Sequence, residues 1–565
     1  MRTRKTRPTP GQWMLVGWLA FALATLVLRP ALPVDETRYL GVALEMAQRG
    51  DLWLLHHNGG AYDHKPPLLF WLINAAWAVT GIHDWSARLV PILLTLLNAR
   101  LLVGLTTRLY PDDAGRADRV LLLFFGTTYL ALYQTALMFD PLLLTGVLLA
   151  WLGLLRGTRG EPAGPLYFGA GLAIGLLAKG PVIWVYTVPA LLLIPLLQPV
   201  PAFRRRPYAD ALLAALIPLG LWLLLAERSE PGMLHRLIVV QTLERITGSH
   251  AAAHPRPLWW YLPLIPLLLL PWSAWPPLWR AVLQHSRALH STPAGRWLAW
   301  LAAVILVSLS LIGGKQVHYL LPLLTLACVY AHGLLLAPAA VPVTVTARLR
   351  PLLAQLAWTG AGPLTGTGDP RAHLTRHILP LLLAAGGLTA LLLAAAVAAH
   401  QHPPDTVAQL LPVLLAALIV LAALLLAVRQ HTPRTGLTAA ASLLTLALIV
   451  EATLGRIGDR YDLRDIAQRA GQAEHAGRPI AWVGHYQNEL RFYGRLTQPV
   501  TALRPEDAAA WIARHPDALV ILRQKRLADE TRIPPTEHRQ PYRSDALLGF
   551  RGEVLTASGA RFDDG

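Results

Sequence analysis

The sequence predicts a polytopic α-helical membrane protein with about thirteen transmembrane helices and a small C-terminal extracytoplasmic α/β domain. Hydrophobic residues make up 54% of the 565 residues and charged residues only 15%, whereas soluble domains carry about a quarter charged residues. The 19 Trp and 15 Tyr suit the interfacial belts of a bilayer. The mean hydropathy of +0.42 agrees, so the composition favours a membrane protein.

The hydrophobic segments are long enough to cross a bilayer, which requires about 20 apolar residues per helix. Lys179-Gly180-Pro181 divides the region 165–198 into two short pieces, because proline interrupts a helix. No small-residue cleavage pattern follows the first span, which is therefore predicted to stay uncleaved. The predicted spans are 12–33, 88–109, 119–135, 138–156, 165–179, 181–198, 208–227, 258–279, 297–313, 317–337, 377–399, 406–428 and 436–454.

The charges of the loops predict the side of the membrane on which each loop lies. Lys and Arg are frequent in the N-terminus and in alternate loops, as in cytoplasmic segments. In the intervening short connections, the only Lys or Arg residues are Lys179 and Lys315. These connections are 134–139, 178–181, 314–318 and 400–405. An odd number of spans then puts the C-terminus outside, together with 34–87 and 228–257. The Gly- and Thr-rich segment 338–376 is predicted to be a cytoplasmic linker.

The chain changes character after the transmembrane domain, 1–454. Residues 455–565 are charged and contain no long apolar run. "RPIAWVG" and "DALVILRQ" are typical of short buried strands, and "RPEDAAAWIARHP" between them predicts a helix with an acidic first turn. This pattern predicts a small extracytoplasmic α/β domain.

The net charge of +17 does not indicate a nucleic-acid partner, because the arginines are scattered over short loops and form no patch. Membrane lipids explain this charge better. The single cysteine, Cys328, lies in an apolar run and excludes an intramolecular disulfide.

Two polar clusters follow the first span. Asp35 and Glu36 stand at the start of a predicted amphipathic helix over 36–49 that lies on the bilayer. Asp35 is predicted to be an N-cap of this helix or a reactive carboxylate, and the two roles are compatible because a cap also fixes the position of a carboxylate. Lys65 stands before two prolines in "AYDHKPPLLFW", which impose extended backbone there. A lysine at headgroup depth either binds a phosphate or snorkels at a helix end.

Further polar residues are predicted to gather on the same membrane face. The segment "LERITGSHAAAHPRPLWWY" supplies Arg245 as a positive group predicted to bind the donor phosphate or the substrate. It also supplies His250 and His254 as metal-binding groups, although a metal site needs three or four ligands. Asp140 lies at the mouth of a span, where a charge indicates a function. Lys179, Lys315 and Tyr319 lie at outer turns, so the pattern favours a lipid-headgroup site.

Seven motifs occur in the order "DETRYLGVALEMAQRGD", "NGGAYDHKPPLLFWL", "ARLVP", "MFDP", "LAKGP", "RITGS…HPRPLWWYLP" and "GGKQVHYLLPLL". Together they resemble the bacterial aminoarabinose-transferase branch of the protein-mannosyltransferase superfamily, the GT-C glycosyltransferases. The similarity covers about residues 10–335 well and the remainder loosely.

The resemblance implies inverting transfer of a sugar from undecaprenyl phosphate on the periplasmic side of the bacterial inner membrane, with a cytoplasmic N-terminus and a periplasmic C-terminal domain. It implies that Asp35 is catalytic and that Lys65 binds the donor phosphate. The expected acceptor is lipid A phosphate and the expected sugar is 4-amino-4-deoxy-L-arabinose. The implied donor-binding positions are Arg38, Lys65, Asp140, Lys179, Lys315 and Tyr319.

One position departs from the family. Many relatives have Glu-Lys-Pro-Pro where this chain has His64-Lys65-Pro66-Pro67, and the family glutamate has been linked to a metal. The chemistry requires no cofactor, but a divalent metal held by His64 with His250 or His254 stays an alternative. An aminosugar also favours an acidic partner, for which the candidates are Glu36, Glu45, Asp63 and Asp84.

Other functions stay open at this level. A transferase of the same family using another sugar, with a protein or another envelope lipid as acceptor, fits the same motifs. A lipid transporter or flippase would place ionisable residues near the midplane, often in repeated halves, and the sequence has no such repeat. A lipid-binding module without turnover would retain its function if Asp35 were replaced.

Overall fold

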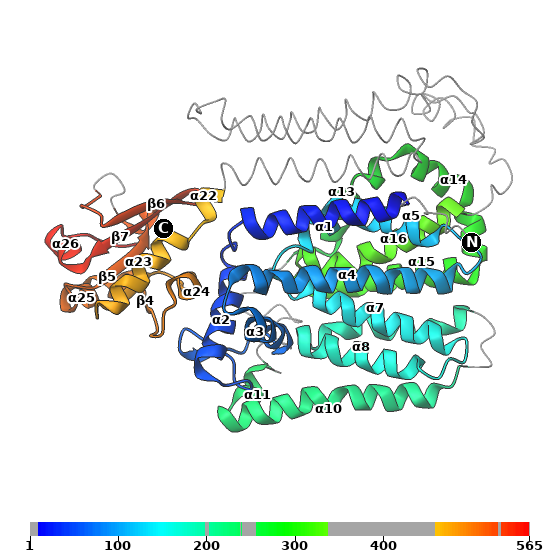
Figure 1. Cartoon of the computed structure of the whole chain (residues 1–565), viewed down its shortest axis with the longest axis horizontal. Helices are drawn as coiled ribbons and strands as arrows, with labels where there is room; N and C mark the ends of the chain where they lie inside the picture. Colours follow the sequence, from blue (N-terminus) through cyan, green and yellow to red (C-terminus); the bar gives the residue numbers. More distant parts are fainter. Residues whose placement is uncertain are drawn as a thin grey trace, which may run out of the picture.

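The computed structural model describes residues 9–197, 203–237, 239, 256–336, 458–528 and 533–563. Figure 1 shows a helical bundle, with an α/β domain beside the end of the bundle that carries α2 and α3. The predicted spans 377–399, 406–428 and 436–454 and the predicted linker 338–376 lie outside the described residues. So do Arg245, His250 and His254.

The bundle is built almost entirely from helices, with one short hairpin of β1 and β2. Its helices are α1 Pro10–Leu28, α2 Asp35–Arg49, α3 Leu68–Thr80, α4 Asp84–Leu109, α5 Arg116–Gly126, α6 Thr128–Tyr133, α7 Asp140–Gly157, α8 Gly164–Lys179, α9 Ile183–Leu192, α10 Arg205–Ser229, α11 Met233–His235, α13 Tyr261–Leu268, α14 Pro276–Ser291, α15 Pro293–Leu311 and α16 Leu321–Leu336. The strands are β1 His56–His57 and β2 Gly60–Ala61, and the 3₁₀ turns are Gly180–Val182, Ile194–Leu197, Leu258–Trp260, Trp272–Ala274 and Val317–Leu320.

Six segments of the described chain are long and apolar enough to cross a membrane, so the molecule is a multi-pass membrane protein. They confirm most of the predicted spans between 88 and 337. The predicted pieces 165–179 and 181–198 correspond to α8 and α9, which are separated at Gly180 (φ 71°) and together form one of the six segments. The Trp151 indole donates to Tyr186 O (2.9 Å), so α9 lies beside α7. The six segments are Asp84–Leu109, Asp140–Gly157, Gly164–Leu192, Arg205–Ser229, Pro293–Leu311 and Val317–Leu336.

Two predicted spans are wrong as continuous helices. The span 119–135 breaks at Thr127 into α5 and α6, because the Thr128 N–H donates to Leu270 O (3.0 Å) instead of continuing the helix. The span 258–279 is divided into a 3₁₀ turn at Leu258–Trp260, α13 over Tyr261–Leu268, a second 3₁₀ turn at Trp272–Ala274 and the start of α14 at Pro276. Pro271 lies in the break after α13 and has no N–H for a helical hydrogen bond. Most of α14 occupies a segment predicted to be a cytoplasmic loop, whereas α3 lies within 34–87, a segment predicted to be an outer loop with amphipathic helices.

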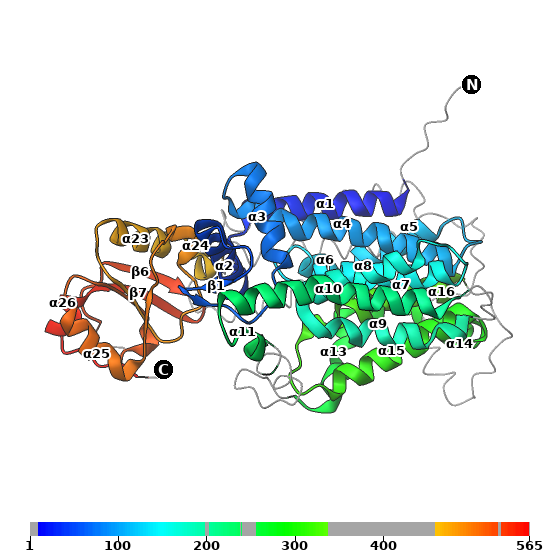
Figure 2. The ribbon, with the colours of Figure 1, turned by 90° about the horizontal axis from the view of Figure 1, so that it is seen from below.

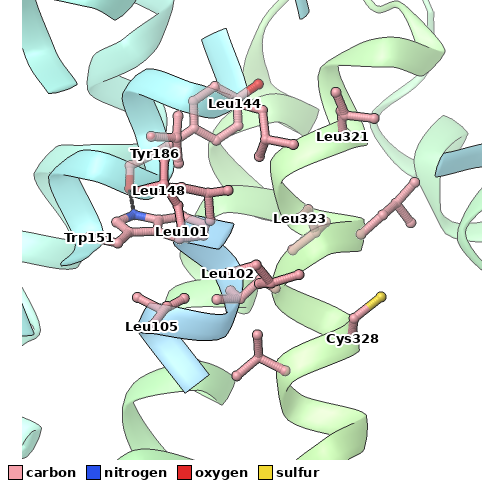
Figure 3. Packing of buried hydrophobic residues seen from close by; sticks show 14 of the residues in the cluster. Leu101, Leu102, Leu105, Leu144, Leu148, Trp151, Tyr186, Leu321, Leu323 and Cys328 are labelled. Atoms are coloured by element: carbon pink, nitrogen blue, oxygen red, sulfur yellow. Dashed lines mark hydrogen bonds between the residues drawn. The ribbon is translucent and has the colours of Figure 1, made fainter. Parts of the chain in front are cut away.

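The centre of the bundle is packed with both glycines and large apolar side chains. Glycines on α7 and α8 let these helices approach closely; a Cβ on Gly146 would lie 2.6 Å from Gly171 O, which is typical of membrane helix pairs. Figure 3 shows Trp151 bonded to Tyr186 beside leucines of α4, α7 and α16. These side chains are buried, so α7 is held rigidly from three sides.

The C-terminal domain is a five-stranded mixed sheet with the order β4-β3-β5-β7-β6. Strand β3 is parallel to β4 and β5, and β7 is antiparallel to β5 and β6. The predicted strands are confirmed as β3 and β5 and the predicted helix as α25. The elements are α22 Gly458–Tyr461, α23 Arg464–His475, β3 Ile480–Val483, α24 Arg491–Gly494, β4 Thr501–Leu503, α25 Pro505–Arg514, β5 Leu519–Arg523, β6 His538–Tyr542, β7 Asp545–Arg551 and α26 Gly552–Ala557.

Both faces of this sheet are covered. Leu519 and Ile521 of β5 pack with α23, while Val520 and Leu522 pack with α25 and α26 on the opposite face. This alternation follows the two-residue period of a strand. The strand segments are therefore continuous apolar runs, which explains why the sequence shows them clearly.

Helix α2 lies between the bundle and the C-terminal domain (Figure 2). The prediction that its apolar stripe lies on the bilayer is wrong, because Tyr39, Val42 and Met46 are buried in a protein cluster with α3 and α7. On its other side, Gly41 approaches Asn488 so closely that a Cβ would lie 2.8 Å from the Asn488 Cβ. The helix that carries Asp35 is thus held by both domains.

Candidate functional site

Helix α2 begins at Asp35, and its N-cap is Val34, which makes no side-chain cap hydrogen bond. The alternative that Asp35 is the N-cap is therefore wrong. The Asp35 side chain is 51% exposed and pairs with Arg38 Nη2. Arg38 Nη1 donates to Gln487 Oε1 of the C-terminal domain (2.9 Å). An oriented but accessible carboxylate at this position can meet a substrate directly.

Glu36, the next residue, is held by partners on every side. Arg29 Nη1 and Nη2 donate to its Oε2 and Oε1 (2.5 and 2.9 Å), and the N–H groups of Leu32 and Leu137 donate to it at 2.7 Å. Burial raises the pKa of Glu36, but the charge and hydrogen bonds of Arg29 outweigh it and lower the pKa to about 2. Glu36 therefore ties α1, α2 and the segment before α7 together.

Replacing Glu36 by glutamine is expected to lower the stability of the protein by about 2–3 kcal/mol at pH 7. Because the pKa of Glu36 is lowered on folding, its contribution is present above about pH 4.5 and is lost as the pH falls toward 2. Thermal unfolding in detergent between pH 7 and pH 3 measures this. The intact protein and the variant should converge at low pH, and a constant difference would contradict the assignment. Glu506→Gln, at an exposed carboxylate, is the control.

Lys65 lies at the start of α3, immediately before Pro66 and Pro67. Pro67 is the N-cap of α3, so the two prolines determine where the helix begins and where the lysine stands. The Lys65 ammonium lies 6.0 Å from the centroid of the Phe139 ring. Phe139 in turn packs edge-on against Tyr39 of α2 and Phe70 of α3. This aromatic cluster joins the segments that carry Asp35 and Lys65.

Asp140 is the first residue of α7 and is buried. Its Oδ1 accepts from Lys179 Nζ (2.6 Å), and its Oδ2 accepts from the Tyr133 hydroxyl (3.1 Å). The Lys179 ammonium lies 4.8 Å from the Tyr319 ring centroid. His318 stacks on Tyr133 at 5.9 Å, and both His318 and Lys65 are electrostatic neighbours of Asp140. The structure therefore brings Asp140, Lys179 and Tyr319 together, as the sequence predicted.

Lys315 is held by two backbone carbonyl groups, and its predicted contact with the donor stays a prediction. Its ammonium donates to Arg256 O (3.0 Å) and Ile312 O (2.7 Å), and the residue is buried. These bonds join the segment before α13 to the turn after α15. Among the described residues, no hydrogen bond or ion pair joins Lys315 to Asp140 or Lys179.

The described residues do not supply a metal site at His64. Within the described part of the chain, no group of three His, Cys, Asp or Glu side chains is arranged to hold a metal ion. His64 Nε2 lies 3.6 Å from Asp63 Oδ1, which provides two side chains at most. His250 and His254, the other predicted ligands, lie outside the described residues.

The four acidic candidates for an aminosugar partner differ clearly in their surroundings. Glu36 is bonded to Arg29. Glu45 is buried and accepts from Gly59 N (2.8 Å). Asp84 accepts from the Tyr493 hydroxyl (3.0 Å). Asp63 lies two residues before Lys65 in the chain, and its side chain is 18% exposed and lies 3.6 Å from His64 Nε2 and 3.9 Å from Arg236 Nε.

The sequence analysis did not identify Tyr133, Phe139 or Gln487. Phe139 stands beside Asp140 in "MFDP", and that adjacency was the available signal. Tyr133 precedes Asp140 by seven residues across a helix break, and no periodicity connects them. Gln487 is 449 residues away from Arg38 along the chain, so only the folded structure brings them together.

Comparison with known proteins supports the resemblance. The family model described as dolichyl-phosphate-mannose-protein mannosyltransferase matches residues 64–224. The undecaprenyl phosphate-alpha-4-amino-4-deoxy-L-arabinose arabinosyl transferase of Serratia proteamaculans is 26% identical over 328 residues, which are 55% of this chain and 57% of that protein. The protein of the same description from Pseudomonas paraeruginosa is 30% identical over 53% of this chain and 55% of that protein.

The fold extends further than the sequence similarity. The crystal structure of ArnT from Cupriavidus metallidurans bound to undecaprenyl phosphate superposes with a TM-score of 0.71, at 18% identity, over 95% of this chain and 97% of that chain. The same protein in the apo state gives a TM-score of 0.70. The alignments with the curated relatives span a little over half of their length. The chain therefore has the GT-C membrane fold of ArnT and resembles the aminoarabinose-transferase branch of that superfamily.

Proposed function

We propose that this chain is an inverting glycosyltransferase that moves 4-amino-4-deoxy-L-arabinose from undecaprenyl phosphate to a phosphate of lipid A. The arrangement of an accessible, arginine-paired carboxylate at Asp35 and a proline-positioned cation at Lys65 carries the proposal. The relatives described as arabinosyl transferases support the donor and the sugar. We place the site on the periplasmic face of the bacterial inner membrane, with the N-terminus in the cytoplasm.

The leaving group of this reaction is a lipid phosphate. As the bond between the anomeric carbon and the phosphate oxygen breaks, negative charge develops on the phosphate, and Lys65 and Arg38 supply the opposing charge. The carboxylate of Asp140 balances the ammonium of Lys179, so this pair contributes shape and hydrogen bonds rather than net charge. Lys65 is therefore the principal cation for the donor phosphate.

The sugar develops positive charge at the anomeric carbon, as in glycoside hydrolysis. The Asp35 carboxylate opposes that charge, while an acceptor phosphate oxygen forms the new bond from the opposite face of the sugar. Such an acceptor is already anionic and needs no strong base. Attack from the opposite face inverts the anomeric configuration, and undecaprenyl phosphate leaves.

Mass spectrometry of lipid A tests the proposal. The host is a Gram-negative strain that lacks its own transferase and still makes the undecaprenyl-linked aminosugar. We expect an aminoarabinose adduct with the intact chain and none with Lys65→Ala expressed at the same level. Absence of the adduct with the intact chain would contradict the proposed sugar or acceptor.

We also propose that transfer requires no metal, because an acceptor phosphate is already anionic and needs no further activation. A metal held by His64 with His250 or His254 is the alternative. Treating the purified protein with EDTA is expected to change its initial rate by less than about twofold. Initial rates are measured before treatment, after treatment, and again after Zn²⁺ is added back to the treated protein. A loss of activity that Zn²⁺ restores would instead support a site that includes His250 and His254.

A further inference from the structure

The C-terminal domain reaches the candidate site through the loop between β3 and α24, residues 484–490. Gln487 in this loop accepts a hydrogen bond from Arg38 Nη1 at 2.9 Å. The other terminal nitrogen of the same guanidinium, Nη2, pairs with Asp35. Two groups from two domains therefore hold the two ends of the Arg38 guanidinium.

The backbone of this loop aims the Gln487 side chain. The Gln487 N–H donates to the Glu489 carboxylate at 2.5 Å. Asn488 is fully buried, has a positive φ of 61° and packs against Gly41 of α2. The Gln487 amide also contacts the His485 ring. The position of Gln487 is thus determined by the same packing that joins the loop to α2.

Arg38 needs such support because its pairing with Asp35 is weak by itself. The Asp35 side chain is half exposed, and an exposed ion pair three residues apart on a helix contributes little stability. An arginine side chain also has many rotamers, and ordering them opposes binding. A second, more sheltered hydrogen bond, which Arg38 donates to Gln487 Oε1, removes part of that cost before the donor arrives.

We infer that Gln487 is a positioning residue, which orients the Arg38 guanidinium toward the donor phosphate and makes the C-terminal domain part of the donor site. This inference rests on the proposed function. The competing explanation is that Gln487 only attaches the domain to the bundle. Other contacts serve that attachment, because Asn58 and the Val500 backbone exchange two hydrogen bonds of 2.8 Å at the same interface.

The full-length protein in detergent or proteoliposomes provides the test, with Gln487→Leu, Gln487→Glu and Asn58→Ala. Leucine has a similar size but cannot accept a hydrogen bond, whereas glutamate keeps the acceptor and adds a charge. Asn58→Ala removes two interface bonds away from Arg38 and is the matched control for attachment. The measurements are the Kd for undecaprenyl phosphate, the KM for the donor and kcat.

Gln487→Leu is expected to raise the Kd and the KM by about five- to tenfold and to change kcat by less than about twofold. Gln487→Glu should restore both constants, and Asn58→Ala should leave them unchanged. The inference alone is overturned if Gln487→Leu binds like the intact chain, if glutamate does not rescue, or if Asn58→Ala produces the same loss. An intact chain that does not bind undecaprenyl phosphate would overturn the proposed function together with the inference.

Discussion

Replacing Asp35 by asparagine is expected to lower kcat for sugar transfer by about a hundredfold or more. The carboxylate is half exposed and oriented by Arg38, so its negative charge is available to oppose the positive charge that develops on the sugar. Asparagine keeps the size and loses the charge. Because Lys65 is unchanged, the KM for the donor should change far less than kcat.

Steady-state kinetics in proteoliposomes that contain donor and acceptor lipids measure this difference. Asp465→Asn is the matched control, since Asp465 also stands in the first turn of a helix and pairs with an arginine one turn later, in the C-terminal domain. A kcat for Asp35→Asn within about threefold of the intact protein would exclude a catalytic role for this carboxylate.

Breaking the pair between Asp140 and Lys179 is expected to have the largest effect on stability. Both side chains are almost fully buried and their charged atoms lie 2.6 Å apart, so Asp140→Asn or Lys179→Met alone leaves an uncompensated buried charge. Each single replacement should cost about 3–5 kcal/mol. The double variant should regain much of this loss, because neither charge then remains.

Thermal unfolding of the four proteins in detergent gives the coupling free energy of this pair. The same cycle at Arg108 and Glu161, which are partly exposed, should give about 1 kcal/mol or less. Additive losses at Asp140 and Lys179 would contradict the interpretation that these two buried charges compensate each other.

Much of the bundle could be predicted from the sequence, because membrane spans are long and uniformly apolar. The spans at 88–109, 138–156, 208–227 and 297–313 needed no tertiary information. The prediction of one continuous helix over 119–135 was wrong for a physical reason that cannot be recognised from composition. A backbone carbonyl of another segment, Leu270 O, takes the Thr128 N–H, and only the folded chain brings the two together.

Helix α2 also shows what the sequence alone could not predict. Its apolar stripe predicted an amphipathic helix, and α2 confirms the helix with nearly the predicted bounds. The pattern cannot distinguish lipid from protein as the partner of an apolar face, because both remove it from water. The structure buries that face against α3 and α7 and covers the opposite face with the C-terminal domain.

The candidate site also has residues that the sequence could identify and residues that only the folded structure distinguishes. Lys65 before two prolines and Asp140 at the mouth of a span could be recognised from local sequence, since their backbone and membrane positions follow from neighbouring residues. Glu36 and Asp35 are adjacent acidic residues with opposite surroundings, one bonded to Arg29 and the other half exposed. Nothing local distinguishes them.

The sequence by itself determined the membrane class, most of the spans, the strands of the C-terminal domain and the residues that carry charge beside the membrane. Hydrophobic patterning and backbone preference depend on residues that are close together in the chain, so they can be recognised from short stretches of sequence. Only the tertiary structure decided which partners these charged side chains meet: Asp140 with Lys179, Glu36 with Arg29, and Arg38 with Gln487. The first and third contacts join residues 39 and 449 positions apart in the chain, because the packing of whole helices and domains sets them.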